Sequence, residues 1–158
     1  MRYISFTDEP SIAPDEFFMK EALKEANTAL SLDEIPIGAV VVANGRIIGR
    51  GHNLTEKLND VTAHAEMLAF TAAANYLGGK YLQGCTLYVT MEPCIMCAGA
   101  SYWTQVSRIV FGAYDPQRGF LRVNPKITHP KTEITGGILE NICSDLVKDF
   151  FKSKRNKI

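Results

Sequence analysis

The sequence lacks the features that would assign it to a specialised class of protein. It has no apolar run long enough to span a membrane, no apolar signal core near its start and no fixed-period repeat. Four cysteines in 158 residues are too few for a disulfide scaffold. With 46% hydrophobic residues, the sequence predicts a single domain over residues 1–158, located in the cytoplasm and not at a membrane. We expect residues 1–12 to be mobile.

An excess of charge of one sign is also lacking, because 17 basic and 17 acidic side chains cancel. The distribution is uneven, since residues 1–34 hold eight acidic residues against three basic ones, whereas residues 150–158 form a basic tail. Such a tail is ordinarily a solvated helix end that the helix dipole favours. The sharper interpretation is a contact with a polyanion.

The spacing of apolar residues predicts alternating helices and strands. Asn44-Gly45 separates two apolar runs and is the dipeptide that best supplies a type I′ hairpin turn. A hairpin followed by alternating elements predicts helices on both faces of a mixed sheet, an α/β/α architecture. Residues 113–135, rich in Gly, Pro and Arg, are expected to form one long irregular connection. The expected helices cover about 14–31, 63–76 with Thr62 as cap, a short stretch after Pro93 and 139–152, and the expected strands cover 38–43, 46–49, 86–90 and 109–111.

Cys94 and Cys97 form a C-x-x-C pair between a predicted strand and a predicted helix. Such a pair can be a redox dithiol, half of a structural zinc site or part of a catalytic metal site. A structural four-cysteine site needs a second pair, but Cys85 and Cys143 stand alone in apolar segments. We expect these two to pack as small hydrophobic residues. Another kind of residue must therefore complete the ligand set.

His64 and Glu66 are the candidates, at the start of the predicted helix over 63–76. A lone histidine is more often a hydrogen-bonded surface or core residue than a metal ligand. Here, however, H-x-E followed by P-C-x-x-C resembles the known signature of zinc-dependent nucleobase deaminases. The pattern predicts one Zn²⁺ per subunit, bound by His64, Cys94 and Cys97.

The chemistry of these residue types agrees with that interpretation. Two thiolates and one imidazole suit tetrahedral Zn²⁺ and leave its fourth position for water, as in catalytic sites. Two thiolates also reduce the acidity of that water, so a separate base is needed. Glu66, two positions from His64, cannot share its helical face and is expected to shuttle protons. The plain alternative is a helix-start glutamate that only the dipole stabilises.

Over residues 18–155 the chain resembles the cytidine-deaminase-like superfamily, and most closely its bacterial tRNA-specific adenosine deaminases. The resemblance implies a three-layer α/β/α fold with a central mixed five-stranded sheet. It also implies hydrolytic conversion of the anticodon wobble adenosine of tRNA to inosine, by a homodimer with its active site near the subunit boundary. The matching segments are residues 34–40, 51–53, 62–66, 86–100, 110–113 and 149–152.

The same resemblance implies contacts to the target base. Asn53 would hydrogen-bond the purine, and the backbone of Ala65 would meet the edge of the base. Pro36 and Ile37 would form a wall of the pocket. The plain interpretation of Asn53 is a turn residue after the hairpin.

Further contacts implied by the resemblance lie beyond the base. Asp115 would touch the ribose of the target or of a flanking nucleotide. The tail, with Phe150, Phe151, Lys152 and Arg155, would lie along the tRNA anticodon stem-loop. In the plain interpretation, Asp115 is a turn residue and the two phenylalanines are core anchors.

Two stretches depart from the tRNA deaminase pattern. Gln117-Arg118-Gly119 stands where a lysine and a small-residue loop are common, and Tyr102-Trp103 resembles deaminases of free guanine. The alternative function is therefore deamination of a free nucleobase such as guanine or cytosine. A catalytically silent, zinc-containing RNA-binding module and a redox dithiol are the remaining alternatives.

Overall fold

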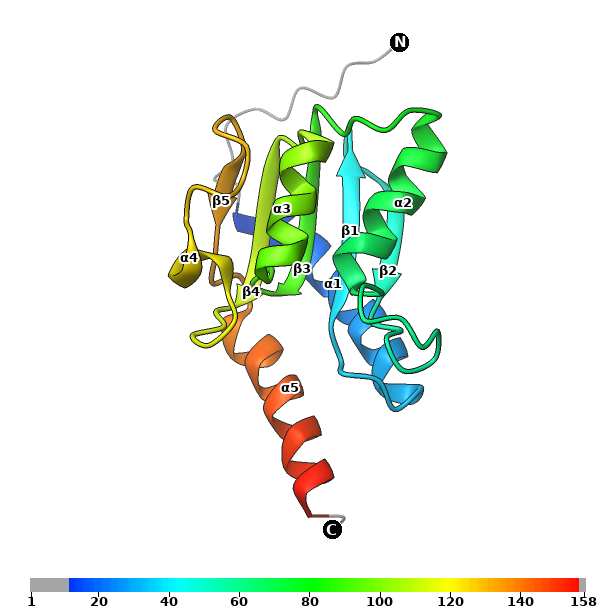
Figure 1. Ribbon diagram of the computed structural model, residues 1–158, viewed down its shortest axis with the longest axis vertical. Helices are drawn as coiled ribbons and strands as arrows, with labels where there is room; N and C mark the ends of the chain where they lie inside the picture. The colour runs from blue at the N-terminus through cyan, green and yellow to red at the C-terminus, as the bar shows by residue number, and fades with distance from the viewer. Residues whose placement is uncertain (1–11, 157–158) are drawn as a thin grey trace.

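A computed structural model describes residues 12–156 as one mixed five-stranded sheet with helices on both faces (Figure 1). The strand order is β2-β1-β3-β4-β5, in which β1 is antiparallel to β2 and β3, whereas β3, β4 and β5 are parallel. The predicted three-layer α/β/α architecture is confirmed. The strands are β1 (Gly38–Ala43), β2 (Arg46–His52), β3 (Cys85–Met91), β4 (Arg108–Ala113) and β5 (Glu133–Thr135). The helices are α1 (Ile12–Ser31), α2 (Ala65–Leu77), α3 (Ile95–Thr104), α4 (Phe120–Val123) and α5 (Glu140–Arg155).

The hairpin of β1 and β2 has the predicted turn, because Asn44 and Gly45 both have positive φ, 51° and 73°. Along β1, successive side chains face opposite sides of the sheet. Val41 packs in the core under α2, and Val40 packs in the core under α1. The uninterrupted apolar run of this strand follows from burial on both faces.

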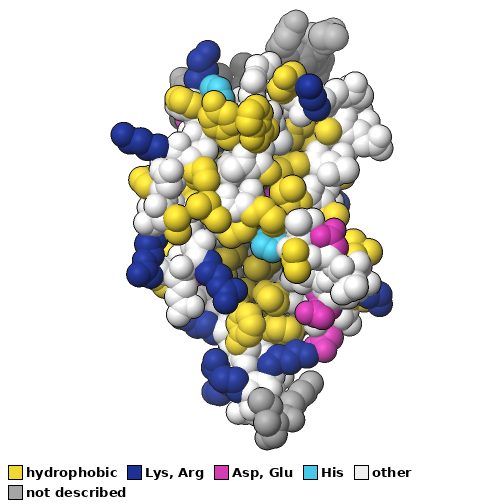
Figure 2. All heavy atoms as spheres, in the orientation of Figure 1, with side chains coloured by type: hydrophobic (Ala, Val, Ile, Leu, Met, Phe, Trp, Pro, Cys, Tyr) yellow, Lys and Arg dark blue, Asp and Glu magenta, His cyan; other side chains and the backbone are white. Residues whose placement is uncertain are grey.

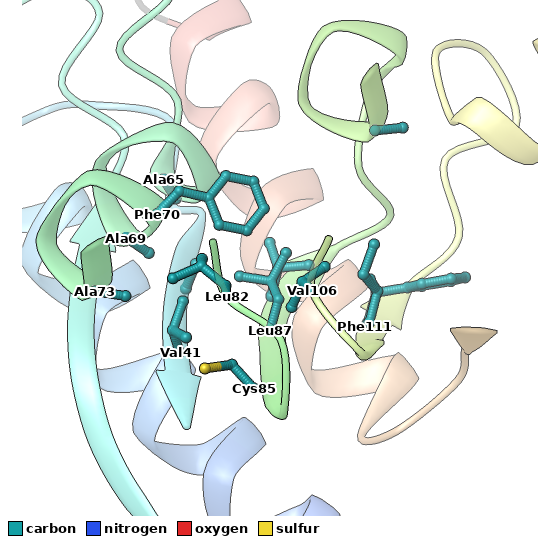
Figure 3. Close-up of a cluster of buried hydrophobic side chains, with 14 of the residues drawn as sticks. Val41, Ala65, Ala69, Phe70, Ala73, Leu82, Cys85, Leu87, Val106 and Phe111 are labelled. Carbon is teal, nitrogen blue, oxygen red and sulfur yellow. The ribbon is translucent and has the colours of Figure 1, made fainter. Parts of the chain in front are cut away.

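Two glycines in β2 allow α2 to lie directly on the sheet. A Cβ atom at Gly51 would stand 2.3 Å from the carbonyl oxygen of Ala65, and one at Gly49 would stand 2.6 Å from that of Ala69. Ala65, Ala69 and Ala73 accordingly point into the buried cluster with strand residues such as Val41 (Figure 3). This contact fixes the position of the N-terminal end of α2.

The opposite face is held by an ion pair with a buried carboxylate. The Asp15 carboxylate on α1 accepts two hydrogen bonds from the Arg108 guanidinium, at 2.7 and 2.8 Å, and one from the Tyr88 hydroxyl at 2.9 Å. Asp15 is 2% exposed, so α1 is tied to β3 and β4 by a desolvated network. Cys85 and Cys143 are each 1% exposed and pack in the two hydrophobic cores, as predicted.

Some expected boundaries were wrong. Thr62 does not cap α2, because its amide and hydroxyl both donate to the Asp60 carboxylate, and the helix begins at Ala65. The expected irregular connection over 113–135 contains α4 and the three-residue β5, which is too short to give an apolar pattern. The last helix starts at Glu140 and continues to Arg155.

Two further expectations concern the ends and the surroundings of the chain. The expected mobile start falls on residues outside the described ones, except that Ile12 already belongs to α1. Between residues 12 and 156, no helix combines the length and apolar character that crossing a bilayer requires.

Candidate active site and metal centre

The candidate site lies where β3 ends and where α2 and α3 begin. After the last residue of β3, the chain turns through Glu92 and Pro93 to Cys94, the N-cap of α3. His64 is the N-cap of α2. Both residues are extended, and neither side chain caps its own helix. Both side chains can therefore point toward a common centre.

The three predicted ligands do converge. The Nδ1 atom of His64 is 3.6 Å from the Cys94 Sγ and 3.5 Å from the Cys97 Sγ. A tetrahedral Zn²⁺ with ordinary Zn–S and Zn–N bonds would separate nitrogen and sulfur by about 3.6 Å. Among residues 12–156, this is the one group of three His, Cys, Asp or Glu side chains close enough to hold a metal ion. The donor set and its spacing fit zinc.

Contacts within the group shift the pKa values of the two thiols in opposite directions. A hydrogen bond from Cys97, followed by one from His64, lowers the pKa of Cys94 to about 4, so Cys94 is a thiolate at neutral pH. The same bond to Cys94, with burial, raises the pKa of Cys97. The hydrogen bond to Cys94 likewise raises the pKa of His64. Metal binding displaces protons from such ligands, so uptake of zinc by this group depends on pH.

Glu66 lies in the first turn of α2 and is only 4% exposed. Burial raises the pKa of its carboxyl group, and a hydrogen bond with Cys97 places it next to the metal-binding group. Its carboxylate is not among the three clustered ligand atoms. A buried carboxyl group beside an open metal position is suited to proton transfer.

Two of the candidate ligands, His64 and Cys94, line a cavity of about 160 Å³ that opens to the surface. Figure 2 shows apolar side chains gathered around a histidine on the face that carries α2 and α3. The cavity is lined by Ile35, Ile37, Asn53, Thr55, His64, Ala65, Glu66, Met91, Glu92, Cys94, Asp115 and Arg118. It therefore combines an apolar wall with a metal-binding end and charged side chains.

Most of the predicted base contacts lie in this cavity. Ile37, Asn53, Ala65 and Asp115 line it together with His64 and Cys94. Pro36 does not line it; it is buried, and its neighbour Ile35 faces the cavity instead.

Asn53 and Asp115 are also turn residues, as in their plain interpretation. The Asn53 side-chain oxygen accepts a hydrogen bond from the amide of Thr55, at 3.3 Å. The Asp115 carboxylate accepts two, from the amides of Gln117 and Arg118, both at 3.0 Å. Both residues therefore shape turns and also line the cavity.

The predicted tail residues are not brought into the cavity. Phe150, Phe151, Lys152 and Arg155 lie on the last turns of α5, which extends beyond the end of the sheet where β3 and β4 finish (Figure 1). Phe150 is buried, as in its plain interpretation, while the other three are exposed. The tail is a surface next to the site end of the sheet, and its contacts with RNA stay a prediction.

Two buried glutamates that sequence reasoning missed hold the loops around the cavity. The Glu92 carboxylate accepts hydrogen bonds from the amides of Asp115 and Leu121, both at 3.1 Å. The Glu34 carboxylate accepts bonds from the amides of Glu56 and Lys57 at 3.2 and 2.6 Å. The available signal was a charged residue directly beside an apolar segment, Glu34 before 35–43 and Glu92 after 86–91. A charged residue at such a place is expected to be buried only when it is paired.

Comparison with known proteins agrees with the site. Residues 12–113 match the family described as the cytidine and deoxycytidylate deaminase zinc-binding region. The chain is 46% identical to a tRNA-specific adenosine deaminase of Bacillus subtilis (strain 168), over 90% of this chain and 92% of that protein.

Solved structures of nucleobase deaminases also resemble this chain. One, from work on A-to-I editing by tRNA:A34 deaminases at the wobble position of transfer RNA, superimposes with a TM-score of 0.77 at 42% identity, covering 82% of this chain and 98% of the other. A guanine deaminase from Bacillus subtilis gives a TM-score of 0.60 at 40% identity, covering 63% of this chain and 64% of the other. The protein described here therefore belongs to the cytidine and deoxycytidylate deaminase family.

Proposed function

We propose that this protein is a zinc-dependent hydrolytic deaminase that converts the wobble adenosine of a tRNA anticodon to inosine and releases ammonia. The observation that carries the proposal is the convergence of His64, Cys94 and Cys97 beside buried Glu66, at one end of an open cavity. The choice of substrate follows the 46% identity to a tRNA-specific adenosine deaminase.

The proposed mechanism gives each residue of the site one task. His64, Cys94 and Cys97 would hold one Zn²⁺ per subunit, which would supply an activated water for attack on the base. Glu66 takes a proton from that water and passes it to the ring nitrogen next to the attacked carbon. The carbon–oxygen bond forms first. Glu66 then takes the second proton, from the new hydroxyl group, and gives it to the exocyclic amine. The carbon–nitrogen bond breaks, ammonia leaves, and the oxygen stays as the carbonyl group of inosine.

The remaining cavity residues position the nucleoside in this proposal. Ile37, with Ile35, forms the apolar wall, Asn53 and the backbone of Ala65 hydrogen-bond the base, and Asp115 contacts a ribose. Asn53 suits this role because it is 5% exposed and lines the cavity.

We propose that the tail on α5 contacts the anticodon loop. Lys152 and Arg155 are exposed on its last turns, as phosphate contacts must be. Removal of residues 152–158, which leaves buried Phe150 in place, is expected to abolish deamination of the stem-loop. Activity that survived this cut would show that RNA is bound in another way.

We propose further that the chain acts as one domain and forms a homodimer, in the cytoplasm where its tRNA substrate occurs. Large apolar side chains on α3, Ile95, Tyr102 and Trp103, are 46%, 40% and 76% exposed. They recur at helical spacing, and exposed apolar side chains that gather in this way are typical of an association surface. Light scattering in solution is expected to give twice the mass of the chain, and the mass of a single chain would contradict the proposal.

A deaminase of free guanine is the second candidate, favoured by the structural match to guanine deaminase and by Tyr102-Trp103. In this chain, however, the Tyr102 ring contacts Trp103 and His129, with centroids 5.4 and 5.5 Å apart. Neither residue of the pair lines the cavity. The pair therefore offers no contact to a base bound beside Glu66.

The deciding experiment offers the zinc-loaded protein an anticodon stem-loop with adenosine at the wobble position and, in parallel, free guanine, cytosine and adenine. We expect ammonia from the stem-loop and none from the free bases. Ammonia from guanine alone would favour the second candidate, and ammonia from none of the substrates would favour a silent RNA-binding module. Thiols that reacted fully before zinc was removed would favour a redox dithiol.

A further inference from the structure

Acidic side chains outnumber basic ones in the lining of the cavity, and this imbalance affects how an RNA substrate can bind. Three carboxylates, those of Glu66, Glu92 and Asp115, line the cavity, whereas Arg118 is its one Lys or Arg among the described residues. Carboxylates alone would repel the phosphates of an approaching RNA. Arg118, the one Lys or Arg that lines the cavity among the described residues, is therefore a side chain that can attract a phosphate.

The backbone of Arg118 is held in a fixed turn. The Asp115 carboxylate accepts hydrogen bonds from the amides of Gln117 and Arg118, both at 3.0 Å. The carbonyl oxygen of Asp115 accepts a third, from the amide of Gly119 at 3.0 Å. Three bonds to one residue define the position from which the arginine side chain extends.

That turn is also tied to the residues that lead to Cys94. Glu92 accepts bonds from the turn at Asp115 and Leu121, and the amide of Phe120 donates to the Pro93 carbonyl at 3.0 Å. Gly119 lies so close that a Cβ atom there would stand 2.0 Å from a Glu92 carboxylate oxygen. The turn therefore keeps a constant position relative to the candidate metal ligands.

The two arginines of this segment have different surroundings. The Arg122 guanidinium donates to the carbonyl oxygen of Pro116 at 2.5 Å and so braces the turn. The Arg118 side chain is exposed, and over residues 12–156 no ion pair includes it. A guanidinium at the cavity wall presents a planar set of donors that matches a phosphate in two-point contact.

We infer that Arg118 binds a backbone phosphate next to the target nucleotide and so favours adenosine within an RNA strand over a free base or nucleoside. The inference rests on the proposed function, because it needs the target base in the cavity beside Glu66. A base in a strand necessarily brings phosphates on both sides of its ribose. A neutral free base brings none and gains nothing from a guanidinium at the wall.

The test measures binding of the anticodon stem-loop to Arg118→Gln, Arg118→Lys and Arg46→Gln, all in a Glu66→Gln background that prevents turnover. Arg46 is a matched control, because it is exposed and starts β2 next to Ala43, which pairs with Cys85 at the far end of β3. Fluorescence anisotropy at several salt concentrations gives both the dissociation constant and its salt dependence.

We expect Arg118→Gln to weaken binding about tenfold and to reduce the slope of log K against log salt by about 0.7, the value for one phosphate contact on a single strand. Arg118→Lys is expected to restore the slope, because it keeps the charge, and only part of the affinity, because it loses the two-point geometry. Arg46→Gln is expected to change neither. Equal slopes for Arg118→Gln and Arg46→Gln, with zinc content and melting temperature retained, would overturn the inference.

Failure of the inference can be told apart from failure of the proposed function. If the protein with Glu66 intact forms inosine in the stem-loop and Arg118→Gln binds it normally, only the inference is wrong. If the stem-loop binds through Arg118 but no inosine forms, the proposed function is wrong and the phosphate contact stands. If the stem-loop does not bind at all, both are wrong.

Discussion

The three buried glutamates around the cavity differ in what their carboxylates contact. Glu34 and Glu92 are 1% and 5% exposed, and each accepts hydrogen bonds from two backbone amides of a neighbouring loop. Glu66 is 4% exposed, but its carboxyl group lies next to Cys97 and is close enough to His64 for the two groups to interact electrostatically. A carboxylate held by two amides serves as a fixed acceptor, whereas one beside a metal-binding group can exchange protons. Burial alone therefore does not identify the catalytic carboxylate; its neighbours do.

The largest expected effect is the loss of a metal ligand, on which the task of Glu66 depends. Cys97→Ala is expected to lose zinc and all detectable deamination, because two protein ligands no longer fix a tetrahedral site. Metal analysis and inosine formation measure the two losses. Cys143→Ala is the matched control, since Cys143 is equally buried but packs in the opposite core. Full activity of Cys97→Ala would contradict the account.

The next effect separates Glu66 from the other two glutamates. Glu66→Gln keeps the size of the side chain but cannot carry the proton, so turnover is expected to fall about 10³-fold. Zinc content measured on the same sample should stay at one ion per chain. Normal turnover with zinc bound would show that Glu66 is a structural residue like Glu92.

Glu92→Gln should have an intermediate effect. The amide group of glutamine faces one of the two backbone donors, which is expected to lower the free energy of unfolding by about 1.5–3 kcal/mol. Displacement of the 115–121 turn is expected to reduce kcat/KM by about 10–100-fold with zinc retained. Urea unfolding and steady-state kinetics measure the two effects. Gly119→Ala is expected to reproduce the kinetic defect, because its Cβ would collide with the Glu92 carboxylate.

The smallest effect on activity is expected for Glu34→Gln. It breaks the same kind of contact, to the amides of Glu56 and Lys57, and should cost similar stability. Asn53, which lines the cavity just before that loop, has its own anchor, a bond from its backbone amide to the Ile37 carbonyl at 3.1 Å. Activity should therefore fall by less than about tenfold. A loss as large as that of Glu66→Gln would remove the distinction between the three glutamates.

The sequence predicted the parts of the site that have a local signature. His64, Cys94 and Cys97 stand at fixed spacing near helix starts, and the structure brings them together. The α/β/α fold followed from the hairpin dipeptide and the alternation of elements. These features depend on residues close together in the chain.

The parts that the sequence did not predict depend on contacts distant in the chain. Glu92 holds amides 23 and 29 positions away, and Glu34 holds amides 22 and 23 positions away. β5 is three residues long and is defined by its pairing with β4. Thr62 looked like a helix cap, but its hydrogen bonds go to Asp60, and His64 takes the cap position. Patterns of neighbouring residues in a single sequence cannot identify hydrogen-bond or pairing partners that lie far away in the chain.

The most direct test of the account is the origin of the oxygen in the product. The zinc-loaded protein and its Glu66→Gln variant are incubated with the adenosine-containing anticodon stem-loop in isotopically labelled water, and the nucleosides are analysed by mass spectrometry. We predict inosine carrying one labelled oxygen, with one equivalent of ammonia, from the protein with Glu66 and almost none from the variant. Unmodified adenosine, unlabelled inosine, or equal product from both proteins would contradict hydrolytic deamination through Glu66.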